Sequence, residues 1–229
     1  ESIDNLEYND SLIINISEGV TSNFKVTTLS KSQYESILDK FKITSNFILY
    51  TGGSDGRKNL TRLISAYAQL LPKLRDTHQL VFAGRMSEGD IQNFKQQAVD
   101  AGLKKNDLIF TGYISDDELV QLYNLCKLYV FPSWHEGFGL PALEAMSCGA
   151  PVIAANTTSL PEVVKNEAAL FSPFSEKEMS IKITQALTDE SFRQHLIKSG
   201  LEQAKQFSWD KSAKLAIEEF EKIWEDKIK

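Results

Sequence analysis

The chain has 229 residues, of which 42% are apolar and 24% are charged, and its formal net charge is −6. These values are typical of one large or two small globular domains that bury an apolar core. The acidic balance argues against a general binder of nucleic acid or of anionic membranes. It leaves room for a local basic pocket that takes a diphosphate.

No apolar run approaches the roughly 18 residues of a membrane span, so we expect none in this sequence. The first four residues, Glu1 to Asp4, lack a signal-peptide pattern. Cys126 and Cys148 are expected to be small buried hydrophobes in a reducing compartment. We therefore expect a cytoplasmic protein, which parts or partners beyond these residues could hold at the inner face of a membrane.

Two segments precede the first clear strand. Residues 1–10 are polar and are expected to be a linker, whereas the apolar run at 12–16 predicts a short strand. Residues 31–41 have helical periodicity. Ser30 is in place to cap that helix, and Gln33 would complete a capping box.

Strands and helices then alternate along the chain. The expected strands are 47–51, 79–83, 107–111, 128–131, 151–154 and 168–171. The expected helices between them are 60–71, 88–101, 116–125, 140–147 and 160–164. Alternation implies parallel pairing, because each crossover brings the next strand back in the same direction. The sequence therefore predicts an α/β fold, a Rossmann-like parallel sheet with helices on both faces.

After Pro173 the pattern is purely helical and predicts a C-terminal extension with helices at 176–187, 189–207 and 210–229. Either Ser208 or Asp210 could cap the last of these helices.

Three loops follow predicted strands and contain polar or glycine residues. They are the glycine loop at 52–59, the turn at 112–115 and the loop that contains Glu136. Ligands of parallel α/β sheets bind at the carboxyl ends of the strands. Because those ends meet at one edge of the sheet, we expect the three loops to form one binding site.

The glycine loop reads Gly52-Gly53-Ser54-Asp55-Gly56-Arg57-Lys58-Asn59. Arg57 and Lys58 stand at the start of the next helix, where each exposed cation costs about 0.3–1 kcal/mol. An anionic ligand would turn that cost into attraction, which favours a diphosphate. The alternative is a solvated basic turn with Asn59 as a cap. The spacing matches neither the dinucleotide fingerprint nor the P-loop.

The loop after the strand at 128–131 contains two acids, Glu136 and Glu144, separated by seven residues. Gly137 and Gly139 flank Phe138 between them, and glycines let the backbone turn sharply and approach a ligand closely. The helix that follows has an N-terminus that favours an anion. We expect a strand, a tight turn and a helix start, with both acids facing a common pocket.

The segment from Glu136 through Glu144, with the residues 145–153 that follow it, resembles the signature of retaining family-four glycosyltransferases. Those enzymes have the two-domain GT-B fold. The resemblance covers about residues 12–229, and only the C-terminal, donor-binding half of such an enzyme. It implies that residues 11–229 form a donor-binding domain, and that the acceptor-binding N-terminal domain of the same polypeptide is missing. Alone, the chain is expected to bind nucleotide sugar but to transfer sugar poorly or not at all.

The resemblance also implies roles for individual residues. Lys58 matches a lysine that contacts the donor diphosphate, Glu136 would contact the transferred sugar, and Glu144 would contact the ribose hydroxyls. The backbone near Ile114 would meet the nucleobase, although Ser115 could equally be a simple helix cap. The implied catalytic residues are Glu136 and Lys58, and the implied substrate-binding residues are Gly52, Gly53, Arg57, Lys58, Ile114, Glu136, Gly137, Phe138, Gly139, Leu140 and Glu144.

One position departs from the family pattern. Many relatives carry arginine directly after the first glycine of the loop, where this chain has Gly53. Whether Arg57 replaces that arginine is left open by the sequence.

The chain resembles bacterial polysaccharide mannosyltransferases, which implies GDP-mannose as the first-choice donor and UDP-hexose as the other class. The implied acceptor is a growing polysaccharide or glycolipid glycan. The resemblance implies that neither a cofactor nor a metal is required, and no Asp-x-Asp motif appears. His78, His135 and His195 form no metal-ligand set with the cysteines. Two alternatives stay open, a nucleotide-sugar epimerase half-domain and a non-catalytic binding module of a multidomain synthase. A retaining glycosidase is disfavoured, since it needs no diphosphate loop.

Overall fold

The computed structural model describes residues 14–228, and the side chains of residues 14–225. The chain divides into two compact units, residues 22–206 and a second unit formed by residues 1–21 with 207–229. The linker expected at 1–10 lies outside the described residues. Within residues 14–228, no helix is both long enough and apolar enough to cross a membrane.

The strand expected at 12–16 is not found where the structure describes it. Its first two residues lie outside the described range, and residues 14–16 have no regular secondary structure. The backbone N–H of Ser17 donates to Oδ1 of Asn15 at 2.8 Å. Such a local side-chain turn competes with extension into a strand. Ser17 also has a positive φ of 59°, which ends any extended run there.

Six parallel strands form a single sheet in residues 22–206. They are β1 (Asn46–Thr51), β2 (His78–Ala83), β3 (Leu108–Phe110), β4 (Leu128–Phe131), β5 (Val152–Ala155) and β6 (Leu170–Phe171). The order across the sheet is β3-β2-β1-β4-β5-β6. The chain therefore builds outward from β1 in one direction and then, from β4 on, in the other. The point of reversal between β1 and β4 is where ligands of such sheets bind.

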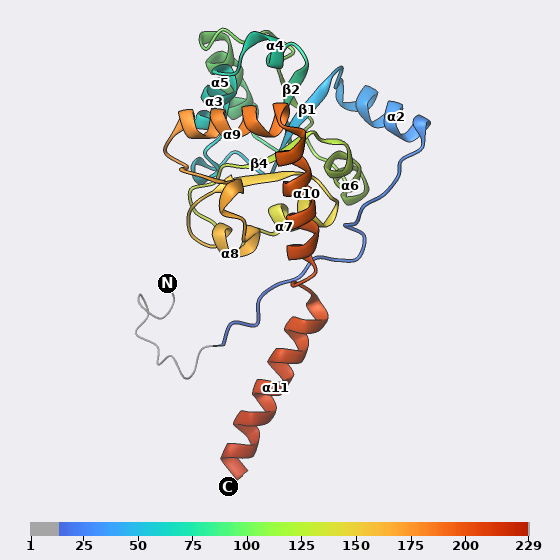
Figure 1. Cartoon of the computed structure of the whole chain (residues 1–229), viewed down its shortest axis with the longest axis vertical. Helices are drawn as coiled ribbons and strands as arrows, with labels where there is room; N and C mark the ends of the chain where they lie inside the picture. The colour runs from blue at the N-terminus through green and yellow to red at the C-terminus, as the bar shows by residue number, and fades with distance from the viewer. Residues whose placement is uncertain (1–13, 229) are drawn as a thin grey trace. The chain divides into compact units, whose positions relative to one another are not determined.

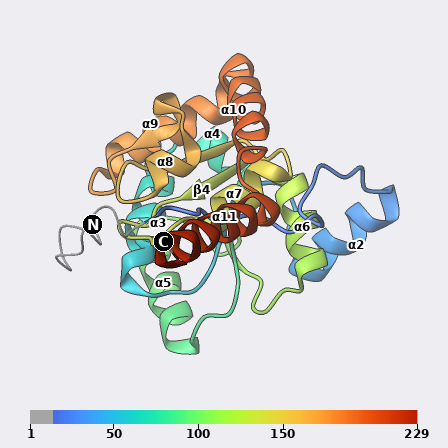
Figure 2. The same ribbon diagram turned by 90° about the horizontal axis from the view of Figure 1, so that it is seen from below.

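Helices cover both faces of this sheet (Figure 1). The helices of residues 22–206 are α2 (Lys31–Phe41), α3 (Leu60–Ala68), α4 (Pro72–Arg75), α5 (Glu88–Asp100), α6 (Asp116–Leu125), α7 (Leu140–Ser147), α8 (Leu160–Val164), α9 (Glu176–Thr188) and α10 (Glu190–Ala204). On one face α3 packs against α5 and α9, and on the other α7 packs against α6, α8 and α10. Figure 2 shows α2 lying outside α6. The predicted α/β class is confirmed.

Local signals explain most helix ends. Ser30 and Gln33 form the expected capping box at α2. The helix expected at 60–71 ends at Ala68 because Pro72 starts a separate short helix, and the residue before a proline avoids the helical region. Between β1 and α3, Gly56–Lys58 forms a 3-10 turn.

The second unit contains one long helix, α11 (Trp209–Ile228). Of the two caps expected for it, Ser208 is used, since its Oγ accepts from the N–H of Lys211 at 3.1 Å. Residues 14–21 run beside the start of this helix. A Cβ on Gly19 would collide with the backbone of Ser208 and Trp209, so that approach requires glycine.

The interior of residues 22–206 is apolar on both faces of the sheet. Strands β1 and β4 are almost entirely buried, as expected for parallel strands covered on each side. Cys126 and Cys148 are buried free thiols, as predicted. Burial raises the pKa of Cys148 to about 12, which keeps the thiol protonated and unreactive.

The loops after β1, β2 and β3 meet at one edge of the sheet, as their strand register requires. Gly52 donates to the carbonyl of Ala83 at 2.9 Å, and Gly84 donates to the carbonyl of Gly112 at 3.2 Å. Gly84 has a φ of +134°, and a Cβ there would lie 2.5 Å from the carbonyl oxygen of Gly52. By contrast, a Cβ on Gly53 would meet only the carbonyl oxygen of Arg85, at 4.0 Å. Gly84 is therefore required by the backbone, whereas Gly53 is not.

We predict that Gly84→Ala destabilises the protein while Gly53→Ala does not. The first change forces a strained φ and a collision with the neighbouring loop, which should cost at least about 2 kcal/mol and lower Tm by roughly 4–8 °C. The second should stay within about 0.5 kcal/mol of the parent. Thermal unfolding followed by circular dichroism checks both, and equal Tm values for the two variants would contradict the assigned backbone requirement.

Candidate functional site

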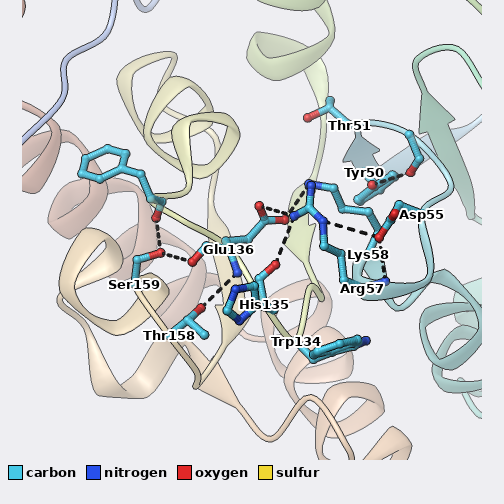
Figure 3. A network of polar contacts seen from close by, with 12 residues as sticks. Tyr50, Thr51, Asp55, Arg57, Lys58, Trp134, His135, Glu136, Thr158 and Ser159 are labelled. Carbon is cyan, nitrogen blue, oxygen red and sulfur yellow. Dashed lines mark hydrogen bonds and ion pairs between the residues drawn. The ribbon is translucent and has the colours of Figure 1, made fainter. Parts of the chain in front are cut away.

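An ion cluster joins the loop after β1 to the loop after β4 (Figure 3). Nζ of Lys58 lies 2.6 Å from Oε1 of Glu136, and Nη1 of Arg57 lies 2.9 Å from Oε2 of the same carboxylate. The side chains of Lys58 and Glu136 are only 13% and 10% exposed, whereas that of Arg57 is 40% exposed. Two expected site residues that are 78 positions apart are thus in direct contact.

Three hydrogen bonds fix the loop that carries the two cations. Oδ1 of Asp55 caps the 3-10 turn by accepting from the N–H of Arg57 at 3.0 Å. The N–H of Trp134 donates to the carbonyl of Arg57 at 3.0 Å, and Nη1 of Arg57 donates to the carbonyl of His135 at 3.1 Å. The basic turn is therefore held against the β4 loop, in which His135 lies.

Asn59 has a different role from the helix cap considered above. It stands at the start of α3, but its side chain makes no capping hydrogen bond there. Instead Nδ2 donates to the carbonyls of Pro132, at 2.9 Å, and Pro173, at 2.7 Å. With its side chain buried, Asn59 ties together the loops after β1, β4 and β6.

The loop after β5 holds the other side of Glu136. The N–H of Glu136 donates to Oγ1 of Thr158 at 3.2 Å. The hydroxyl of Ser159 points to the carbonyls of Phe138, at 2.6 Å, and Glu136, at 3.1 Å (Figure 3). Sequence reasoning missed Thr158 and Ser159, since no spacing rule links a β5 loop to a β4 loop.

Glu136 and Glu144 have opposite environments. Burial acts to raise the pKa of Glu136, but the ammonium of Lys58 and the guanidinium of Arg57 outweigh it and hold that pKa below its ordinary value. Burial raises the pKa of Glu144 to about 7, although the hydroxyl of Tyr123 opposes the rise. That hydroxyl donates to Oε2 of Glu144 at 3.1 Å. One acid is therefore a charged partner of cations, and the other is close to its titration point near neutral pH.

The start of α7 offers backbone donors. Gly139 is the N-cap residue with a φ of +118°, and a Cβ there would lie 2.8 Å from Cδ2 of Leu160. Within residues 14–228, the N–H groups of Gly139 and Leu140 have no acceptor. A Cβ on Gly137 would meet nothing within 4 Å, so the space beside this residue is open. The arrangement leaves room and donors for ligand oxygens.

The turn after β3 combines a helix cap with an open surface. Ser115 and Glu118 form a capping box at the start of α6, so the simpler role considered for this serine is confirmed. The guanidinium of Arg85 lies 5.7 Å from the ring centroid of Tyr113, which is 71% exposed. Ile114 is half-buried between Tyr113 and Ser115, and its contact with a nucleobase stays a prediction.

Two nearby cavities do not include the acids. One of about 510 Å³ is lined by Asp55, Arg62 and Asp90 among others, and one of about 760 Å³ lies beside β6. Neither lining contains Glu136 or Glu144, so the expected common pocket is not one of these cavities. Among the described side chains, no group of three His, Cys, Asp or Glu residues could hold a metal ion.

Known proteins similar to this chain are glycosyltransferases. A mannosyltransferase of Escherichia coli, "Serotype-specific mannosyltransferase WbdA", is 42% identical over 221 residues, which cover 95% of this chain and 27% of that protein. "O-antigen chain mannosyltransferase B" of the same organism is 41% identical over 177 residues, which cover 76% of this chain and 45% of the relative. The chain thus spans about a quarter and less than half of the lengths of these two relatives.

Solved structures show the same fold. The C-terminal domain of a glycosyl transferase group 1 protein from Francisella tularensis superposes with a TM-score of 0.69 at 25% identity, covering 82% of this chain and 97% of that domain. This chain therefore has the fold of the C-terminal half of a GT-B enzyme. The family model described as "Glycosyl transferases group 1" matches residues 35–203, which is most of the chain. The chain belongs to the glycosyl transferases group 1 family.

Proposed function

We propose that this chain is the donor-binding domain of a retaining mannosyltransferase that uses GDP-mannose and extends a bacterial polysaccharide or a glycolipid glycan. The observation that carries the proposal is the contact of Lys58 and Arg57 with Glu136 at the carboxyl edge of the sheet. The printed names of the relatives from Escherichia coli support the choice of mannose. In this proposal, a separate acceptor-binding domain of the same polypeptide binds the glycan acceptor.

The cluster is suited to exchange one anion for another. The ammonium of Lys58 is largely buried, so leaving it without a counter-charge would cost free energy. In this structure Glu136 provides the counter-charge. A donor diphosphate carries more negative charge than one carboxylate and takes over both cations. Glu136 is then free to accept hydrogen bonds from hydroxyls of the sugar. The N–H groups of Gly139 and Leu140, which have no acceptor among the described residues, contribute donors for sugar or phosphate oxygens.

Arg57 supplies the cation that Gly53 lacks. Gly53 has open space where relatives carry arginine, and Arg57 reaches the same carboxylate as Lys58. Its guanidinium has five N–H donors in a planar fork that matches phosphate oxygens. The diphosphate is therefore gripped from one loop by two consecutive residues.

The protonation state of Glu136 limits its role in transfer. Because its pKa is held low, Glu136 is a carboxylate at neutral pH and not a proton donor. It stabilises positive charge on the sugar as the bond to the diphosphate breaks, while Lys58 stabilises the charge that develops on the leaving group. Attack by the acceptor on the same face retains the configuration at the anomeric carbon.

Two alternatives make different products. An epimerase half-domain would convert the donor to its epimer without any acceptor present. A non-catalytic module would leave sugar transfer by the full-length polypeptide unchanged when Lys58 and Glu136 are replaced. Product analysis with GDP-mannose, carried out on the full-length protein and on its Lys58 and Glu136 variants, therefore separates both alternatives from a transferase.

Titration calorimetry with GDP, UDP and their hexose derivatives tests the donor. We expect GDP and GDP-mannose to bind, and Lys58→Ala to weaken GDP binding at least about tenfold, since charge-assisted hydrogen bonds contribute about 1.5–3 kcal/mol. Lys73→Ala, which removes an exposed lysine in α4, is the matched control and should bind like the parent. Equal affinities for GDP in the Lys58 and Lys73 variants would contradict the proposal.

Glu136→Gln should separate diphosphate binding from sugar binding. Removing the carboxylate charge frees Lys58 and Arg57, so we expect free GDP to bind several-fold tighter than to the parent protein. The mannose moiety should lose its hydrogen-bond acceptor, so GDP-mannose should gain less than GDP or bind more weakly. The same calorimetry measures both ligands, and weaker binding of free GDP by Glu136→Gln would show that the resting pair does not compete with the ligand.

Ionisation of the buried Glu144 side chain should lower the stability of the folded protein at high pH. Its pKa is raised in the folded state, so burial of the charged form destabilises the protein as pH rises from about 4.5 to about 7. We expect Glu144→Gln to unfold a few °C above the parent at pH 8, a gain on the order of 1–3 kcal/mol, and to match it at pH 4.5.

Glu202→Gln is the control for that comparison, because Glu202 is an exposed acid on α10. It should follow the parent at both pH values. A Glu144→Gln variant that is no more stable than the parent at pH 8 would refute the burial cost.

A further inference from the structure

Three hydroxyl groups form a continuous hydrogen-bonded chain that ends at Glu144. Oγ1 of Thr51, the last residue of β1, lies 3.0 Å from the hydroxyl of Tyr129 in β4 and 3.0 Å from that of Tyr123 in α6. The hydroxyl of Tyr123 lies 3.1 Å from Oε2 of Glu144 in α7. The side chains of Thr51, Tyr123 and Tyr129 are all buried. Four elements of the fold thus contribute one residue each to a single polar path.

Proton counting gives this path a direction. An ionised Glu144 has no proton, so Tyr123 must donate its only hydroxyl proton to the carboxylate. Thr51 must then donate to the oxygen of Tyr123, and Tyr129 must donate to Thr51. All three hydroxyl dipoles point toward Glu144. Hydrogen bonds aligned in this way strengthen one another, and together they favour the charged form of the acid at the end.

Other buried tyrosines end on the backbone. The hydroxyl of Tyr67 donates to the carbonyl of His78 at 2.6 Å, and that of Tyr50 donates to the carbonyl of Gly53 at 2.8 Å. Those bonds need no explanation beyond satisfying a buried phenol. The path through Tyr123 instead ends on a carboxylate at the ligand edge of the sheet. Phenylalanine would fill the same volume at position 123 without a polar path through the core.

We propose that Tyr123, with Thr51 and Tyr129 behind it, is a positioning residue that keeps the carboxylate of Glu144 ionised and aimed for the vicinal hydroxyls of the donor ribose. This inference rests on the proposed function. Two neighbouring ribose hydroxyls are donors that an ionised carboxylate can accept together, whereas a protonated one offers fewer acceptor sites. Tyr123 acts through Glu144 and does not itself touch the nucleotide.

Calorimetric titration of the full chain with GDP and with 2′,3′-dideoxy-GDP, between pH 5.5 and 8.5, tests this role. In the parent protein, GDP affinity should fall as pH is lowered through about 7, because Glu144 becomes protonated. The midpoint of this fall in affinity with pH should lie at higher pH in Tyr123→Phe. At pH 7 the affinity of this variant for GDP should be about tenfold weaker than that of the parent. The dideoxy analogue should bind the parent and Tyr123→Phe equally well, because it has no ribose hydroxyls that could donate hydrogen bonds to Glu144.

Two further variants separate positioning from a general loss of stability. Tyr67→Phe removes a buried phenol hydrogen bond far along the sheet from Glu144 and should leave the GDP midpoint unchanged. Thr51→Val breaks the path one step behind Tyr123 and should move the midpoint in the same direction by less. The inference would be overturned if the pH midpoint for GDP binding were the same in the parent and in Tyr123→Phe. It would also be overturned if Tyr123→Phe lost affinity for GDP and for the dideoxy analogue by the same factor.

A measurement without nucleotide distinguishes failure of the role assigned to Tyr123 from failure of the proposed function. In carbon-13 NMR, the signal of the Glu144 carboxyl, assigned with Glu144→Gln, should titrate at higher pH in Tyr123→Phe than in the parent. If GDP does not bind the parent but this shift is seen, the donor proposal fails and the effect of Tyr123 on Glu144 stands. If the NMR titrations of the parent and of Tyr123→Phe coincide, the role assigned to Tyr123 is refuted, whether or not GDP binds.

Discussion

The contact between Glu136 and the two cations of the glycine loop is the interaction on which the site depends. It connects strands β1 and β4, which are neighbours only because the order of the sheet reverses between them. Around it, Asn59 fixes the loops after β4 and β6, and Thr158, in the loop after β5, accepts a hydrogen bond from the N–H of Glu136. A charged pair that is mostly screened from water would be costly in isolation. Here the surrounding hydrogen bonds keep it in a defined geometry.

The two acids of the signature are made unlike by their surroundings. Glu136 lies between an ammonium and a guanidinium and stays charged, whereas Glu144 lies beside buried phenols and titrates near neutral pH. Neighbouring carboxyl groups with separated pKa values can take different tasks in one site. The environment, and not the residue type, therefore separates the pKa values of the two acids, which is what the different roles proposed for them require.

Most of the architecture could be predicted because its signals are local. Capping at Ser30 and Ser115 and the apolar runs of the strands act within a few residues, and parallel pairing follows from alternation. The same logic placed the loops of Lys58 and Glu136 at one edge of the sheet, whereas the direct contact of the two side chains and the adjacency of β1 and β4 come from the structure. The links through Tyr123, Ser159 and Asn59 could not be found, because a buried tyrosine or asparagine looks the same in sequence whatever it bonds. The strand expected at 12–16 is absent at residues 14–16 because the side chain of Asn15 turns the backbone there.

The empty space beside Gly53 has a consequence for how such loops diverge. A backbone that tolerates a side chain at one position and presents a guanidinium from another, four residues later, can keep its net positive charge while the residue that carries it changes place. A comparison of single positions would score this as the loss of an arginine. What a diphosphate requires at the end of β1 is a positive electrostatic potential, so such loops are better compared by that field than by residue identity.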